Sequence, residues 1–137
     1  MGDYRKLDVW KKAHAVSLEV DKLAAGIRAS QHRALRNQMV RSAESVAANI
    51  VEGSGQESAK EFRRFLRIAG NSANETDYHL LTARDKALIS AAAYDKLSER
   101  ITEVARMLSG LRKYLKSLEE KPAKRRNGGG APDPPSN

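Results

Sequence analysis

The residue types that most often carry out catalysis or bind metals are few in this sequence, and they form no catalytic pattern. Cysteine is absent from the 137 residues, which excludes disulfides, thiolate nucleophiles and cysteine-bound metals. A di-iron site in a helical bundle needs glutamates followed by histidine three residues later, and none of the three histidines has that spacing. Glu75 and His79 are four residues apart, which indicates a pair on the surface of one helix. The sequence therefore predicts no enzyme activity, no metal site and no cofactor.

Basic side chains are the one abundant group whose arrangement suggests a chemical role. Lysine and arginine number 25 against 17 aspartates and glutamates, and the net charge is +8. The last nineteen residues contribute +1 of that charge, so residues 1–118 carry +7. Around an expected third helix, Lys60, Arg64 and Arg67 lie opposite the apolar side, with Arg63 at their margin. Such a stripe is typical of proteins that bind a phosphate backbone, although charged outer faces are also common on soluble helices.

The candidate nucleic-acid-binding residues come from the expected third and fourth helices and from the C-terminal tail. They are Lys60, Arg63, Arg64, Arg67, Arg106, Lys113, Lys124, Arg125 and Arg126. Aromatic residues make up only 5% of the chain, and most of them occupy apolar positions of the helices, which argues against a base-stacking platform. Any nucleic acid should therefore be recognised by its shape and its backbone.

Four segments show the apolar periodicity of helices that pack together. Apolar residues recur at alternating spacings of three and four within residues 9–27, 39–50, 62–87 and 97–118. No segment alternates with a period of two over a useful length, so strands are not expected. Because short connections join antiparallel neighbours, the sequence predicts an all-α, up-down-up-down antiparallel four-helix bundle.

Glycine and serine mark the expected helix ends. Gly53 suits the left-handed position just after a helix, and Ser58 followed by Glu61 is a capping box for the third helix. Ser30 is a candidate N-cap for the second helix. Gly70 falls inside the third helix, where it indicates a slight bend, a close approach to another backbone, or a hinge.

The composition changes after residue 118. Residues 119–137 contain no apolar side chain larger than alanine and are rich in proline and glycine, so we expect the bundle to span 1–118 and a flexible basic tail to span 119–137. No run approaches the roughly 20 apolar residues that a membrane span needs, and the first residues lack the apolar core of a secretory signal. The expected compartment is the cytoplasm.

Two stretches of the sequence follow the pattern of a known family. The first is Asp8-Val9-Trp10-Lys11-Lys12-Ala13, and the second runs from Gln38 to Ala69 and contains Asn-Ile-x-Glu-Gly, Ser-x-x-Glu-Phe and Phe-Leu-x-Ile-Ala. Ser72, Glu75 and Leu80 continue the second pattern. Over residues 5–118 the chain resembles the bacterial four-helix-bundle family of proteins encoded in intervening sequences of large-subunit rRNA genes.

The resemblance implies an assembly and a set of partners. Relatives form a ring-shaped homopentamer of four-helix bundles. A similar barrel occurs in the accessory variability determinants of diversity-generating retroelements, basic proteins that bind a reverse transcriptase and RNA. The family has no established catalytic residues, and we expect its matched polar residues to specify the fold; they are Asn49, Glu52, Glu61, Ser72 and Glu75.

Surplus apolar side chains independently favour self-association. Leu18 lies opposite the apolar side of the first expected helix, and Ile68 and Leu81 flank that of the third. We therefore expect a non-enzymatic homo-oligomer, which the resemblance implies is a pentamer. We expect it to bind RNA or a ribonucleoprotein. Its biological role would be that of an accessory factor to a reverse transcriptase, or of a protein associated with rRNA intervening sequences. The alternative is a protein–protein scaffold or adaptor with no direct role in nucleic-acid binding.

Overall fold

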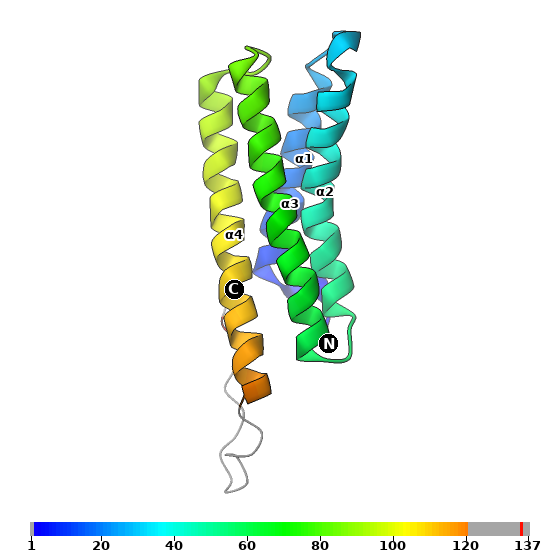
Figure 1. Ribbon diagram of the computed structural model, residues 1–137, viewed down its shortest axis with the longest axis vertical. Coiled ribbons are helices and arrows are strands. Elements are labelled where there is room, and N and C mark those ends of the chain that lie inside the picture. Colours follow the sequence, from blue (N-terminus) through cyan, green and yellow to red (C-terminus); the bar gives the residue numbers. More distant parts are fainter. Residues whose placement is uncertain (1, 121–134, 136–137) are drawn as a thin grey trace, which may run out of the picture.

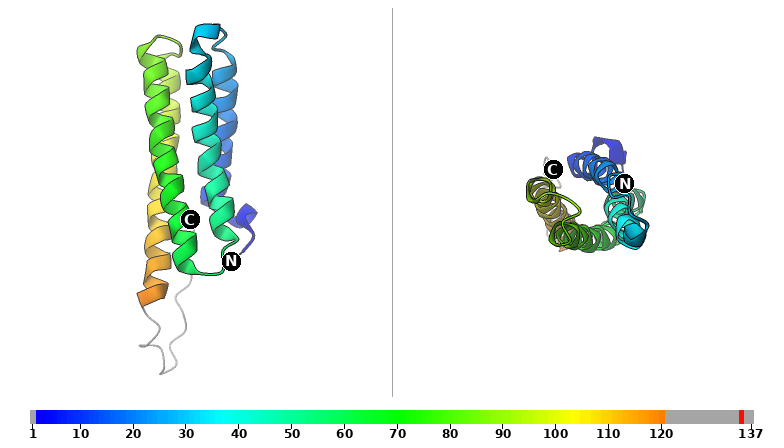
Figure 2. Two further views of the ribbon diagram at one scale, coloured as in Figure 1. Left: turned by 45° about the vertical axis from the view of Figure 1, so that its right-hand side comes forward. Right: turned by 90° about the horizontal axis from the view of Figure 1, so that it is seen from above.

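The chain folds into four long helices that run alternately up and down around a shared interior (Figures 1 and 2). A computed structural model describes residues 2–120 and residue 135. The helices are α1 (Asp8–Ala25), α2 (Arg33–Ser54), α3 (Ala59–Asp85) and α4 (Ala91–Glu120), and short 3₁₀ turns at Tyr4–Lys6 and Ser30–His32 precede α1 and α2. No strand occurs among the described residues. The prediction of an all-α fold with four helices is confirmed.

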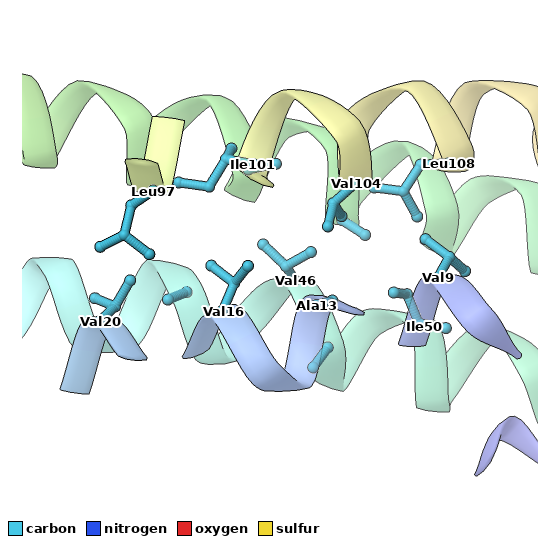
Figure 3. Close-up of a cluster of buried hydrophobic side chains, with 14 of the residues drawn as sticks. Val9, Ala13, Val16, Val20, Val46, Ile50, Leu97, Ile101, Val104 and Leu108 are labelled. Carbon is cyan, nitrogen blue, oxygen red and sulfur yellow. The ribbon is translucent and has the colours of Figure 1, made fainter. Parts of the chain in front are cut away.

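Each helix packs against its neighbours in sequence, and α1 also packs against α4, so that α1 and α3 lie diagonally across the bundle. Figure 3 shows side chains from α1, α2 and α4 converging on the interior, among them Val20, Ile50 and Leu108. Most of the predicted apolar positions are buried, but Ala87 is exposed and Leu118 is only partly buried. Each large side chain removed from water contributes about 1.5–3 kcal/mol. The middle of the core is lined by small side chains such as Ala13, Ala43 and Ala73 around a cavity of about 10 Å³.

Polar groups join α2 to α3 inside this apolar frame. The Ser45 and Ser72 hydroxyl oxygens are 2.9 Å apart, and Asn49 Nδ2 donates to both the carbonyl and the hydroxyl oxygen of Ser45, at 2.8 and 3.0 Å. Thr76 Oγ1 donates to the Ser72 carbonyl at 2.8 Å. Asn49 and Ser72 therefore have the structural role expected of them, because they satisfy partly buried polar groups where two helices meet.

Ion pairs join α1 to α4. Lys12 Nζ lies 2.8 Å from Glu103 Oε1, and Arg100 pairs with Glu19. Grooves of about 330 and 470 Å³ open along this contact. Of the neighbouring pairs of helices, α1 and α4 make the least contact with each other.

The structure corrects two of the expected helix ends. Gly53 lies inside the last turn of α2 and has no left-handed backbone. A Cβ atom at this position would lie 2.8 Å from Phe62 Cδ1 and 2.9 Å from Phe65 Cβ, so the glycine is needed for close packing between α2 and α3. Ser30 begins a 3₁₀ turn instead of capping α2, which starts at Arg33.

The start of α3 has the Ser58 cap that the sequence predicts. Glu61 N donates to Ser58 Oγ at 3.1 Å, which is the predicted N-cap. The helix continues without a break through Gly70, where an added Cβ would have no neighbour within 4 Å. Close approach of another backbone is therefore not the reason for this glycine.

The connection from α3 to α4 depends on a left-handed alanine. The apolar period predicts that the third helix ends near Ser90, but α3 ends at Asp85 and Ala87 has a φ of 59°. Leu88 N donates to the Ala83 carbonyl and Ala87 N to the Arg84 carbonyl, both at 2.9 Å, which is the Schellman pattern of helix termination. Tertiary packing of Leu88 against the core accompanies this turn.

The last helix ends at Glu120, two residues beyond the predicted boundary at 118, and Glu119 still contacts the bundle through Arg63. The remainder of the predicted tail lies outside the described residues, apart from residue 135, and so do Lys124, Arg125 and Arg126.

Two glycines in similar helical settings should respond oppositely to the same substitution. Gly53→Ala should lower the free energy of unfolding by about 1–3 kcal/mol because its methyl group meets Phe62 and Phe65. Gly70→Ala should raise it by about 1 kcal/mol because the added methyl group enters open space in a helix interior. Urea unfolding followed by circular dichroism at one fixed protein concentration measures both, and equal stabilities would contradict the packing role of Gly53.

Ala87→Gly should stabilise the fold by up to about 1 kcal/mol, because glycine adopts the left-handed conformation without the steric cost that alanine bears. Ala48→Gly, at an exposed position inside α2, is the matched control and should cost about 1 kcal/mol. A lower urea midpoint for the Ala87 variant would show that the turn does not carry this strain.

Candidate nucleic-acid interface

A basic groove of about 220 Å³ lies between the first turns of α3 and the last turns of α4. Because the two helices are antiparallel, these segments lie side by side at one end of the bundle (Figures 1 and 2). The groove is lined by Lys60, Glu61, Arg63, Arg64 and Arg67 of α3 and by Arg112 of α4. Four of the nine candidate residues therefore come together on one surface.

The local sequence explains how α3 presents these cations. The Ser58 cap fixes the start of the helix, and Phe62, Leu66 and Ala69 are buried in the core. The helical period then leaves Lys60, Arg64 and Arg67 exposed, while Arg63 faces α4. The predicted placement of these four side chains is what the structure shows.

Two ion pairs neutralise part of the groove. Arg63 Nη2 lies 2.8 Å from Glu119 Oε2, with both side chains 28% exposed. Arg64 lies 3.3 Å from Glu61 and also stacks over the Phe65 ring, with its Cζ 4.5 Å from the ring centroid.

The other three cations of the groove have no such partner. Within the described part of the chain, no carboxylate pairs with Lys60, Arg67 or Arg112. Five cationic side chains face two carboxylates, which leaves an excess of positive charge at this surface. The surface therefore attracts anions.

Arg112 was missed by the sequence analysis. It lies between the outer face of α4 and the buried Leu111, on the side that faces α3. A usable signal was present, because Arg112 and Glu119 are seven residues apart and so share one side of the helix.

Arg106 and Lys113 are exposed on α4 but do not line the groove. Arg106 lies on the outer face of α4, where its charge acts on the neighbouring Glu103. There the pKa of Glu103 is lowered chiefly by its hydrogen bond from Lys12, and to a smaller extent by the charge of Arg106.

The predicted Glu75–His79 pair is present, with His79 Nε2 3.4 Å from Glu75 Oε2. His79 is buried, however, and does not lie on the surface, because it follows Ser72 by seven positions on the side of α3 that faces α2. Among the described side chains, those of residues 2–119 and 135, no group of three or more histidine, aspartate or glutamate side chains could hold a metal ion. Across the same residues, none of the helices has both the length and the apolar content needed to cross a bilayer.

The fold and the groove together define an all-helical bundle with a strongly basic surface between two neighbouring helices. Residues 5–110 match the family model described as 23S rRNA-intervening sequence protein. The chain belongs to that family.

A solved structure supports the assignment. It is the crystal structure of a protein of unknown function from the S23 ribosomal protein family of Bacteroides thetaiotaomicron VPI-5482. The two chains are 27% identical and superpose with a TM-score of 0.72, covering 77% of this chain and 98% of the other. No curated protein matches the chain.

Proposed function

We propose that this protein is a non-enzymatic, oligomeric RNA-binding protein that holds the RNA backbone in the groove between α3 and α4. The observation that carries the proposal is the set of three unpaired cations, Lys60, Arg67 and Arg112, on one concave surface. Membership of the rRNA intervening sequence protein family supports RNA as the anion. The RNA or ribonucleoprotein partner would be met in the cytoplasm, in an rRNA setting or in complex with a reverse transcriptase.

The groove suits a phosphate backbone better than bases. Lys60 and Arg67 are seven residues apart along α3, a distance of about 10 Å, which spans more than one phosphate of a strand. The Phe65 ring, in the same turns of α3, is half-buried and stacked on Arg64. Binding should therefore be weakly dependent on sequence and strongly dependent on salt.

Replacing Lys60, Arg64 and Arg67 together by Gln should weaken binding to unrelated single-stranded RNAs by at least about tenfold at moderate salt. It should also reduce the slope of log affinity against log salt by about 2, because each lost phosphate contact contributes about 0.7. Filter binding or fluorescence anisotropy over a salt series gives both quantities. A protein–protein scaffold would show neither RNA affinity nor this dependence.

The matched control replaces Lys22, Lys86 and Lys96 by Gln, which removes the same charge from exposed positions at the other end of the bundle. If both triple variants lost the same amount of RNA affinity, RNA would be attracted by the overall positive charge of the protein and not by the groove in particular. A chain that ends at Glu120 keeps the Arg63–Glu119 pair and measures the contribution of Lys124, Arg125 and Arg126.

Self-association into a ring is the second part of the proposal. Among the residues that the structure describes, Leu18 and Tyr78 are the exposed large apolar side chains, at 58% and 63%. The two side chains lie at a similar level along the bundle axis, because Val16 and Thr76, two residues before each of them, line the same central cavity. They point away from the bundle on opposite sides, because α1 and α3 are diagonal to each other. Association through two different surfaces gives a ring where the rotation between subunits closes, and the family resemblance supplies both the ring and the number five.

Mass photometry or sedimentation equilibrium should give about five times the chain mass of 15.1 kDa. Leu18→Lys and Tyr78→Lys should each break the ring into smaller species, whereas Thr102→Lys, at an exposed polar position of α4, should not. Mixing the Leu18 and Tyr78 variants should restore one intact interface and give a heterodimer. A monomeric wild-type protein at micromolar concentration would contradict the ring.

A further inference from the structure

Arg63 and Arg112, which line the basic groove, and Glu119, which pairs with Arg63, form the floor of the groove. Each of these three side chains has a charged-group atom without a hydrogen-bond partner in the part of the chain that the structure describes. Arg63 Nε, Arg112 Nε and Glu119 Oε1 are buried and have no hydrogen-bond partner among the described residues. Buried polar atoms of charged groups are rarely left in this state, because losing water without gaining a partner is costly. These three atoms therefore distinguish the floor of the groove from an ordinary charged helix surface.

In this structure the Glu119 carboxylate satisfies only part of the cluster. Glu119 uses Oε2 for Arg63 Nη2, at 2.8 Å, and its second oxygen stays unpaired. The two arginines come from different helices and line the same groove, so their guanidinium groups approach it from two sides. A phosphate group has more acceptor oxygens than a carboxylate and accepts from arginine in paired, charge-assisted hydrogen bonds.

We propose that Arg63 and Arg112 form a discrete phosphate site on the floor of the groove, and that Glu119 occupies Arg63 until a phosphate group displaces it. The inference rests on the proposed function only in that RNA would supply the phosphate. Glu119 then competes with incoming anions for Arg63. Weakly charged anions do not displace it, whereas a phosphate group with further negative charges beside it does. The groove volume of about 220 Å³ is smaller than the roughly 300–1,000 Å³ of small-molecule pockets, which favours a phosphate and its sugar over a whole cofactor.

The variants that test this site change one atom group at a time. Arg112→Gln should weaken phosphate binding by about tenfold, the effect of losing one charge-assisted hydrogen bond. Arg106→Gln removes the same charge from the outer face of the same helix and should change binding by less than about twofold. Glu119→Gln keeps the size of the side chain but removes the competing charge, and it should tighten binding severalfold.

The experiment titrates the full-length protein separately with inorganic pyrophosphate and with a mixed-sequence single-stranded RNA, and follows the arginine Nε–H signals by ¹⁵N nuclear magnetic resonance. Both ligands should shift the Arg63 and Arg112 signals and slow their exchange with water. Arg63→Lys and Arg112→Lys, which keep the charge but remove the guanidinium fork, assign the signals and should also bind more weakly. Circular dichroism of each variant verifies that the bundle is intact.

The outcomes separate the site from the proposed function. If pyrophosphate binds with the expected variant pattern and RNA does not bind, the phosphate site is supported and RNA binding is contradicted. If RNA binding depends on Lys60, Arg64 and Arg67 while the Arg112 and Glu119 variants behave like Arg106→Gln, the discrete site is overturned and RNA binding remains. Weaker binding by Glu119→Gln would overturn the role of Glu119 as a competitor.

Discussion

The close approach of α2 and α3 at Gly53 is the constraint on which the basic groove depends. With no Cβ at this position, Phe62 and Phe65 can pack directly against the end of α2. That contact, together with the Ser58 cap, fixes where α3 begins and how it is rotated about its axis. The rotation in turn decides that Arg63 faces α4 while Lys60 and Arg67 face solvent, so a packing requirement on one side of α3 positions charges on the other.

Electrostatics at this end of the bundle are divided between two helices. Glu119 lies near the carboxyl end of α4, where a negative side chain is unfavourable to the helix dipole, and Arg63 compensates by pairing with it at 2.8 Å. Lys60, Arg67 and Arg112 remain without such compensation. The α1–α4 contact shows the opposite pattern, because Lys12 pairs there with Glu103 and Arg100 with Glu19. Positive and negative side chains are thus paired at the α1–α4 contact, whereas the groove between α3 and α4 keeps an excess of positive charge.

The number of helices was predictable from the sequence, because the side of a helix that faces the core needs an apolar residue every three or four positions. Leu66, Leu80 and Leu108 occupy such positions and are buried. Features that depend on contacts between helices were not predictable. Gly53 is determined by two phenylalanines of the next helix, and Arg112 becomes part of the groove only because α3 lies beside it. Ala87 shows a third limit, since an alanine in a left-handed turn has no signal of its own in the sequence.

The groove and the proposed ring make compatible demands on α3. Arg67 and Tyr78 are eleven residues apart, so the cationic and the exposed apolar parts of the helix are separated by about 16 Å along its axis. A ring formed through Leu18 and Tyr78 would repeat the groove once per subunit. One RNA strand that reached two grooves would bind the second at a high effective concentration, so weak contacts at each site would add up to tight binding without sequence-specific contacts. A protein with few exposed aromatic side chains and many cations can gain affinity in this way, because repetition of a backbone site replaces recognition of bases.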